Sequence, residues 1–148
     1  MYSINSNYYR LIFVGRPSIE KGLEDLLNAL EILKDYKWSL TIVGEIHPSI
    51  DLSYYSRRSI NKIINIGPVQ NTQIPSLLNR NQILIVPSHY ENFGQIIIEA
   101  MACGKAIIAS RTGGIKDIII HKENGLFFKP QNFKDLVYSP PKKGVVRL

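Results

Sequence analysis

The strongest constraint on the fold is a run of four apolar residues, Ile83-Leu84-Ile85-Val86, that passes through a short polar turn into an apolar helical segment. A strand without polar alternation is buried on both faces, which is typical of a parallel sheet covered by helices on both sides. The turn at residues 87–92 would then lie at the carboxyl edge of the sheet. Ligands of open α/β sheets bind at that edge, next to the free N–H groups of helix amino-termini.

Short apolar segments alternate with helical segments along the rest of the chain. The pattern predicts strands at residues 11–14, 38–43, 63–66, 82–86, 106–109 and 126–128. It predicts helices at residues 23–33, 52–60, 73–79, 93–102 and 115–120, with Asn132 as the cap of one more. The order predicts an α/β fold, a Rossmann-like doubly wound parallel sheet of about six strands in a single domain. We assign residues 11–136 to this domain, residues 1–10 to a lead-in and residues 137–148 to a disordered or non-native tail.

Two carboxylates follow the apolar strand, Glu91 in the turn and Glu99 in the helix, with seven residues between them. If most of that interval is helical, the side chains start at most about 12 Å apart. This is roughly the length of a nucleoside diphosphate sugar from its sugar to its ribose. Glu91 could accept hydrogen bonds from the sugar and Glu99 from the ribose, with the amides near Asn92, Phe93 and Gly94 facing the phosphates. The alternatives are an N-cap-like role for Glu91 and a salt bridge or loop cap for Glu99.

A second candidate group lies in the first strand-to-helix loop. Gly15 and Arg16 follow the first predicted strand, and Lys21 precedes the first predicted helix. Both cations are therefore expected at the same sheet edge as Glu91. Arg can bind a phosphate through two parallel hydrogen bonds, whereas Lys acts as a point charge. The alternative is a pair of solvated loop charges.

Several short segments together resemble the donor-binding half of the GT-B glycosyltransferases, and within them the large retaining family GT4. The resemblance covers residues 10–135 in the family's order. The resembling segments are Phe13-Val14-Gly15-Arg16, Glu20-Lys21-Gly22, Thr41-Ile42-Val43-Gly44, Gly67-Pro68-Val69, Pro87-Ser88, Glu91-Asn92-Phe93-Gly94, Glu99-Ala100-Met101-Ala102-Cys103-Gly104, Thr112-Gly113-Gly114 and Asn124-Gly125. The sequence departs from the family at Lys105, where the family often has proline.

The resemblance implies transfer of a sugar from a nucleotide-diphosphate sugar donor to a glycan or lipid-linked acceptor, with retention. It implies that Arg16 and Lys21 stabilise the departing diphosphate and that Glu91 orients the sugar. It also places Glu99 at the ribose, the backbone of Gly67 and Val69 at the nucleobase, and Gly113 and Gly114 near the donor. No metal and no further cofactor are expected, because the two cations would serve the diphosphate.

The resemblance also implies an acceptor-binding domain before this one, which residues 1–10 cannot supply. We therefore expect the donor to be bound by a catalytically incomplete chain, with that domain provided in cis or in trans. One alternative is a non-catalytic nucleotide-sugar-binding or interaction module, such as half of a split enzyme. Another is a different GT-B activity, such as nucleotide-sugar epimerisation.

The composition predicts a globular domain, with 45% hydrophobic and 20% charged residues. No apolar run reaches the roughly 18 residues of a membrane span, and no secretory signal is present, so we expect a cytoplasmic protein. The net charge of +6 fits diphosphate binding, contact with anionic lipid at the inner face of the membrane, or a solvated surface. Nucleic acid is not expected as a partner, because the cations are scattered and no such motif occurs. His89 is interpreted as a surface loop residue.

Overall fold

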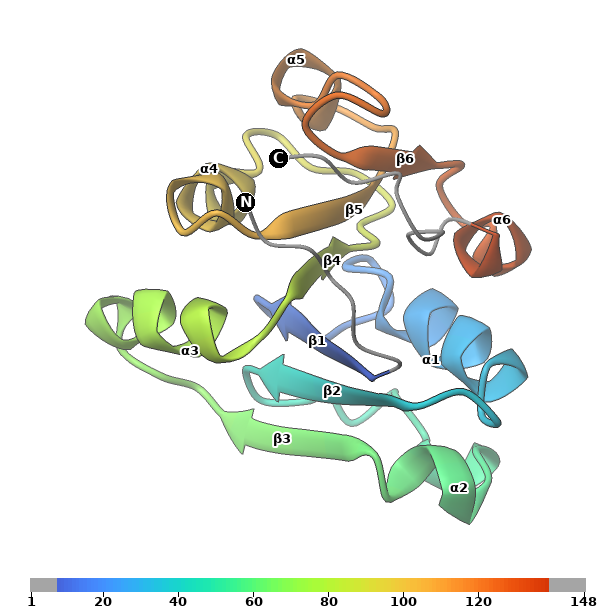
Figure 1. Cartoon of the computed structure of the whole chain (residues 1–148). Coiled ribbons are helices and arrows are strands. Elements are labelled where there is room, and N and C mark those ends of the chain that lie inside the picture. Colours follow the sequence, from blue (N-terminus) through green and yellow to red (C-terminus); the bar gives the residue numbers. More distant parts are fainter. Residues whose placement is uncertain (1–7, 139–148) are drawn as a thin grey trace.

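The computed structural model describes residues 8–138, which form a six-stranded, wholly parallel sheet in the order β3-β2-β1-β4-β5-β6 (Figure 1). The strands are β1 (Tyr9–Val14), β2 (Trp38–Val43), β3 (Ile63–Gly67), β4 (Ile83–Val86), β5 (Ala106–Ser110) and β6 (Leu126–Phe128). The predicted Rossmann-like α/β sheet is confirmed. Strand order reverses direction between β1 and β4, because the chain first builds one side of β1 and then crosses to the other.

Six α-helices connect or follow the strands within the described residues. They are α1 (Leu23–Ile32), α2 (Arg57–Ile60), α3 (Ile74–Arg80), α4 (Gln95–Ala102), α5 (Ile115–Ile118) and α6 (Phe133–Val137). The prediction of one helix over residues 52–60 is wrong. A 3₁₀ turn (Leu52–Tyr54) and α2 replace it, because Ser56 is extended and its hydroxyl accepts the N–H of Ser59, which starts a new helix.

Two apolar clusters hold the helices to opposite faces of the sheet. One cluster joins α1 and α6 to side chains such as Leu11, Leu40 and Ile85. The other joins α3, α4 and α5 to the alternate residues of the same strands, such as Ile12 and Leu84. Figure 1 shows α1 and α6 on one side of the sheet and α3 and α4 on the other. Since β1 and β4 contribute to both clusters, their unbroken apolar character reflects burial on both faces.

The ends of this unit differ slightly from the prediction. Strand β1 begins at Tyr9, inside the predicted lead-in, and α6 ends at Val137, the first residue of the predicted tail. The side chain of Asn132 caps α6 by accepting the N–H of Asp135, as the sequence suggested. Residues 1–7 and 139–148, which include most of the predicted tail, lie outside the described part of the chain. Among residues 8–138, none of the helices has the length and hydropathy needed to cross a bilayer.

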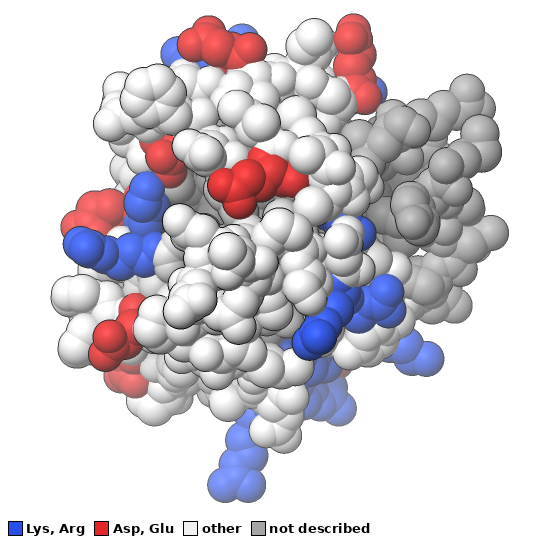
Figure 2. Space-filling model, turned by 90° about the vertical axis from the view of Figure 1, so that its left-hand side faces the viewer, with Lys and Arg blue, Asp and Glu red and all other residues white. Residues whose placement is uncertain are grey.

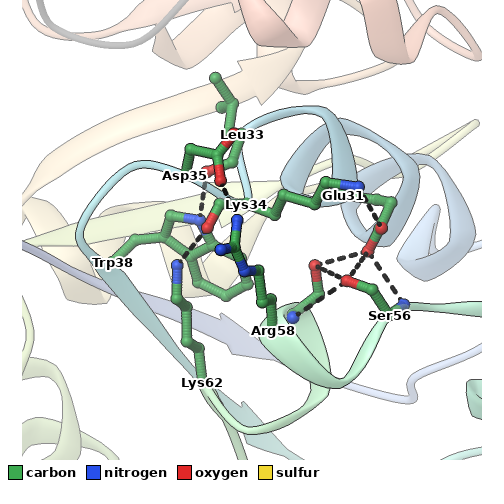
Figure 3. A network of polar contacts seen from close by, with 9 residues as sticks. Glu31, Leu33, Lys34, Asp35, Trp38, Ser56, Arg58 and Lys62 are labelled. Atoms are coloured by element: carbon green, nitrogen blue, oxygen red, sulfur yellow. Dashed lines mark hydrogen bonds and ion pairs between the residues drawn. The ribbon is translucent and has the colours of Figure 1, made fainter.

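A polar network ties the end of α1 to α2 at the amino edge of the sheet (Figure 3). The Glu31 carboxylate accepts hydrogen bonds from the hydroxyls of Ser56 and Ser59 at 3.1 and 2.5 Å. Nearby, the Lys62 ammonium donates to two main-chain carbonyls and lies 4.9 Å from the ring centroid of Trp38. These contacts fix the α1–β2 and α2–β3 connections relative to each other.

Candidate functional site

A cavity of about 270 Å³ opens at the carboxyl edge of the sheet, where the strand order reverses between β1 and β4. Four segments form its walls: the end of β1 with Gly15, the start of α3 with the preceding Asn71, the end of β4 with Pro87 and Ser88, and the first turn of α4. Lys21, Glu91 and Glu99 also line it. The cavity therefore combines a strand-order reversal with a helix amino-terminus, which is the usual ligand position in open α/β sheets.

Lys21 and Glu91 form an ion pair at this cavity although they are far apart in the sequence. The Lys21 Nζ lies 2.9 Å from Glu91 Oε2, and the Ser88 hydroxyl donates to the same oxygen at 3.3 Å. The Lys21 side chain is 37% exposed and that of Glu91 is 21% exposed. An ion pair with this much water access contributes about 1 kcal/mol or less, so a ligand can rearrange it at little cost. Lys21 has three N–H donors and can serve Glu91 and an anion together.

Glu99 lies on α4 and also lines the cavity. Within residues 8–138 its carboxylate makes neither a hydrogen bond nor an ion pair, so the salt-bridge and loop-cap alternatives find no support there. Its side chain is half-buried, although most of its neighbours in the sequence are apolar. A carboxylate facing a cavity without a partner is free to accept hydrogen bonds from a ligand.

Close backbone contacts bring Lys21 and Glu91 together. A Cβ on Gly22 would lie 1.8 Å from the carbonyl oxygen of Pro87, so only glycine lets the start of α1 approach the end of β4 this closely. On the other side of the Glu91 loop, a Cβ on Gly113 would lie 1.9 Å from the Glu91 carbonyl oxygen. Gly114 donates its N–H to that same oxygen at 2.9 Å.

Gly113 and Gly114 therefore support the loop that carries Glu91. Gly113 has φ 49°, which favours glycine, whereas Gly114 has a φ of −70° that suits any residue. Gly114 is instead constrained by space, because its Cβ would lie 2.0 Å from the carbonyl oxygen of Asn92. Neither glycine lines the cavity.

His89 lies in a loop, as the sequence suggested, but its side chain is held in place by contacts with α1. Its Nε2 lies 2.8 Å from Asp25 Oδ2 of α1, and its main-chain N–H donates to the Glu20 carbonyl at 2.9 Å. Its own carbonyl accepts the hydroxyl of Thr112 at 3.1 Å. The loop that carries Glu91 is thus tied to α1 on one side and to the loop after β5 on the other.

The other predicted site residues lie around the cavity rather than in it. Arg16 follows Gly15 on the same rim, but its side chain is exposed and outside the cavity lining. Asn92 and Phe93 lie in the loop before α4 with exposed side chains, Phe93 at 80%. Gly94 lines the cavity and has φ 61° as the N-cap of α4.

Gly67 and Val69 lie at the end of β3, which is separated from β1 by β2, and they do not line the cavity. Gly67 accepts the N–H of Gly44 through its carbonyl at 2.8 Å.

Residues that the sequence reasoning missed include Ser88, Asn71 and Gln95, which all line the cavity. Ser88 had a usable signal, since it comes two residues after the end of the apolar strand. Asn71 did not, because it precedes α3 and reaches the cavity only through the tertiary fold.

Charges of both signs gather on the side of the molecule where α3 and α4 lie. Figure 2 shows acidic side chains at the centre of this side and Lys and Arg groups to their left and lower right.

Among residues 8–138, no three His, Cys, Asp or Glu side chains are arranged to hold a metal ion. The polar groups in the cavity are thus one ammonium, two carboxylates, small polar side chains and helix N–H groups, which suits a ligand with both hydroxyls and anionic oxygens.

Comparison with known proteins identifies the family of the chain. Residues 2–139 match the family described as "Glycosyl transferases group 1". An uncharacterized glycosyltransferase of Methanocaldococcus jannaschii is 32% identical over 125 residues, which are 82% of this chain and 32% of that protein. The chain spans about a third of the length of the curated relatives that it matches, 32% and 35% for two of them.

Solved structures share the fold of this chain. The C-terminal domain of a glycosyl transferase group 1 family protein, LpcC of Francisella tularensis, superposes with a TM-score of 0.73 at 30% identity, covering 88% of this chain and 72% of that one. HepE of Anabaena, solved in complex with UDP-glucose, superposes with a TM-score of 0.74 at 25% identity, covering 89% of this chain and 38% of that one. This chain belongs to the glycosyl transferases group 1 family and corresponds to the C-terminal domain of its GT-B fold.

Proposed function

We propose that this domain binds the nucleotide-diphosphate sugar donor of a retaining glycosyltransferase of the GT4 type, with the donor in the cavity between β1 and β4. The observation that carries the proposal is the convergence of Lys21, Glu91 and Glu99 on one cavity beside the first turn of α4. The UDP-glucose bound by HepE supports a donor of this chemical class.

Each side chain has a distinct role in the proposed complex. Glu99 accepts hydrogen bonds from the ribose hydroxyls, and the N–H groups at the start of α4 face the diphosphate. Glu91 turns from Lys21 toward the hydroxyls of the sugar. Lys21, with Arg16 moving in from the rim, stabilises the negative charge that grows on the diphosphate as the sugar leaves. Because these cations serve the diphosphate, we propose that the transfer needs no metal ion, and the activity should then persist in excess EDTA.

The nucleobase would lie toward β3, near the backbone of Gly67 and Val69, and the loop containing Gly113 and Gly114 would hold Glu91 from the opposite side. The acceptor, a glycan or a lipid-linked glycan, would enter from the open side of the cavity, where an acceptor-binding domain supplies the second wall. That domain would also exclude water from the reacting sugar.

We propose a cytoplasmic protein that reaches lipid-linked acceptors at the inner face of the membrane.

Paired titrations with UDP and UDP-glucose test the two carboxylates separately. Glu99→Ala should weaken both ligands equally, by about 1–3 kcal/mol, because both contain the ribose. Glu91→Ala should weaken UDP-glucose by a similar amount and leave UDP unchanged, because UDP lacks the sugar. Isothermal titration calorimetry, with GDP and ADP in parallel, measures these affinities.

Either of two results would contradict the proposal. The first is no binding of UDP, GDP or ADP at millimolar concentration by the unaltered chain. The second is a Glu99→Ala variant that binds every ligand as the unaltered chain does, which would remove Glu99 from the site. Glu123→Ala is a matched control, since Glu123 is an exposed acid outside the cavity lining.

A further inference from the structure

A second cavity lies beside β6, the edge strand of the sheet, and shares no lining residue with the proposed donor cavity. Its volume is about 700 Å³. Arg111 directly follows β5 and Lys129 directly follows β6, while Lys116 comes from α5. In Figure 1, α5 and β6 lie at one end of the sheet, beyond β5 and away from β1.

The cavity carries an excess of positive charge. Arg111, Lys116 and Lys129 line it, and Asp135 is the acid in its lining. One oxygen of the Asp135 carboxylate accepts the main-chain N–H of Lys129 at 2.6 Å. None of the four ion pairs recorded among the described residues includes one of these three cations. Three like charges around one cavity repel each other, and an anion bound between them would relieve that repulsion.

Phe127 and His121 hold part of this cavity in a fixed geometry. Their rings stack with centroids 6.1 Å apart and an interplanar angle of 11°, and the guanidinium carbon of Arg111 lies 5.9 Å from the Phe127 centroid. The Nδ1 of His121 accepts the main-chain N–H of Phe127 at 2.9 Å. The neutral imidazole therefore carries its proton on Nε2, which supplies one more hydrogen-bond donor at the cavity.

We propose that this cavity is a second anion-binding site, one that takes a phosphate monoester or pyrophosphate group. Three cations against one acid favour a dianion over a singly charged carboxylate. A guanidinium group can donate two parallel hydrogen bonds to two phosphate oxygens. The two ammonium groups and the imidazole N–H can donate to the remaining phosphate oxygens. The group is carried either by a soluble phosphate compound or by a lipid head group. The site does not depend on the proposed donor function, because the two cavities use different residues.

Amide NMR titration of the labelled chain with inorganic pyrophosphate tests the site directly. Pyrophosphate should shift the amide signals of residues 111 and 127–129, and the shifts should diminish as sodium chloride is added. In the double variant Arg111→Ala with Lys129→Ala, these shifts should require at least tenfold more pyrophosphate. The double variant Lys37→Ala with Arg57→Ala loses the same charge from exposed positions at the amino edge and should titrate like the unaltered chain. Well-dispersed spectra of both variants show that they are folded.

A second arm separates the two sources of the phosphate. Sedimentation with vesicles of phosphatidylglycerol, compared with phosphatidylcholine alone, should be reduced by Arg111→Ala with Lys129→Ala if the group belongs to a lipid. Pyrophosphate shifts without vesicle binding would identify a soluble phosphate compound. The proposal is overturned if pyrophosphate shifts only amides around Lys21 and Gly94 and vesicle binding is the same in both double variants. A failed UDP titration would leave this result untouched, so the two proposals fail separately.

Discussion

Gly22 is the residue whose size most directly decides the geometry of the candidate site. It is the point where the start of α1 meets the carbonyl of Pro87, and Lys21 precedes it in the chain. A side chain at position 22 would push Lys21 away from the Glu91 loop. The contact between Lys21 and Glu91 therefore depends on Gly22, which has no side chain of its own.

Gly22→Ala should destabilise the protein more than Gly67→Ala does. Their φ values are nearly equal, 75° and 72°, so the conformational strain of alanine, about 1–2 kcal/mol, is common to both. Only Gly22 has a contact that a Cβ would violate, since Gly67 has nothing within 4 Å of that position. We expect Gly22→Ala to cost about 1–3 kcal/mol more than Gly67→Ala in urea unfolding. Equal losses would mean that the approach to Pro87 tolerates a methyl group.

Asp25 and His89 should be energetically coupled. Their side chains are 16% and 24% exposed, and the contact between them links α1 to the loop that carries Glu91. In a double-mutant cycle of Asp25→Ala and His89→Ala, we expect a coupling of about 0.5–1.5 kcal/mol in unfolding free energy. Additive effects of the two substitutions would show that the contact contributes nothing to holding the loop.

At the scale of elements, the junction of α1 with α2 should make stability depend on pH. The hydrogen bond from Ser59, assisted by those from Ser56 and by Lys34, holds the pKa of Glu31 below its ordinary value. A carboxyl group with a lowered pKa in the folded state stabilises the fold above its ordinary pKa of 4.5, and that contribution is lost as pH falls through the folded pKa. The network in Figure 3 thus acts at neutral pH and fades in acid.

Glu31→Gln should therefore cost about 1 kcal/mol of unfolding free energy at pH 7 and progressively less as the pH is lowered into the acid range. Urea unfolding at a series of pH values measures this difference. Asp35→Asn is a suitable control, because the ion pair of Asp35 with Arg58 is about 70% exposed on both sides and should contribute little. If Glu31→Gln loses the same stability at every pH, the loss comes from packing rather than from the charge.

At the scale of the whole molecule, the chain forms one wall of the proposed active site, and an acceptor-binding domain would form the other. It spans about a third of its curated relatives, and Lys21, Glu91 and Glu99 are all reached from one open cavity. On the proposed function, the chain alone should bind UDP-glucose and release UDP only at the background rate, because nothing positions the acceptor or excludes water. UDP release well above background from the chain alone would contradict this view. Transfer should appear when an acceptor-binding domain is supplied as a fusion or a second chain.

Much of the fold could be read from local pattern. The apolar run at residues 83–86 and the leucines of residues 23–33 were enough to predict a parallel sheet covered on both faces, since burial repeats with the period of each element. The helix predicted at residues 52–60 failed for an equally local reason: Ser56 offers the backbone a cap that competes with helix continuation. The gathering of Glu91, Glu99 and Lys21 at one rim was also predictable, because carboxyl ends of parallel strands share an edge.

What the sequence determined by itself was the set of elements and the edge of the sheet at which the charged residues lie. Only the tertiary structure decided which of them meet: Lys21 with Glu91, His89 with Asp25, and the cations that follow β5 and β6 around a second cavity. Periodic burial constrains each element separately and carries no information about contacts between residues 64 or 70 positions apart. Those contacts depend on strand order and on close approaches such as Gly22 against Pro87, which exist only once the sheet is assembled.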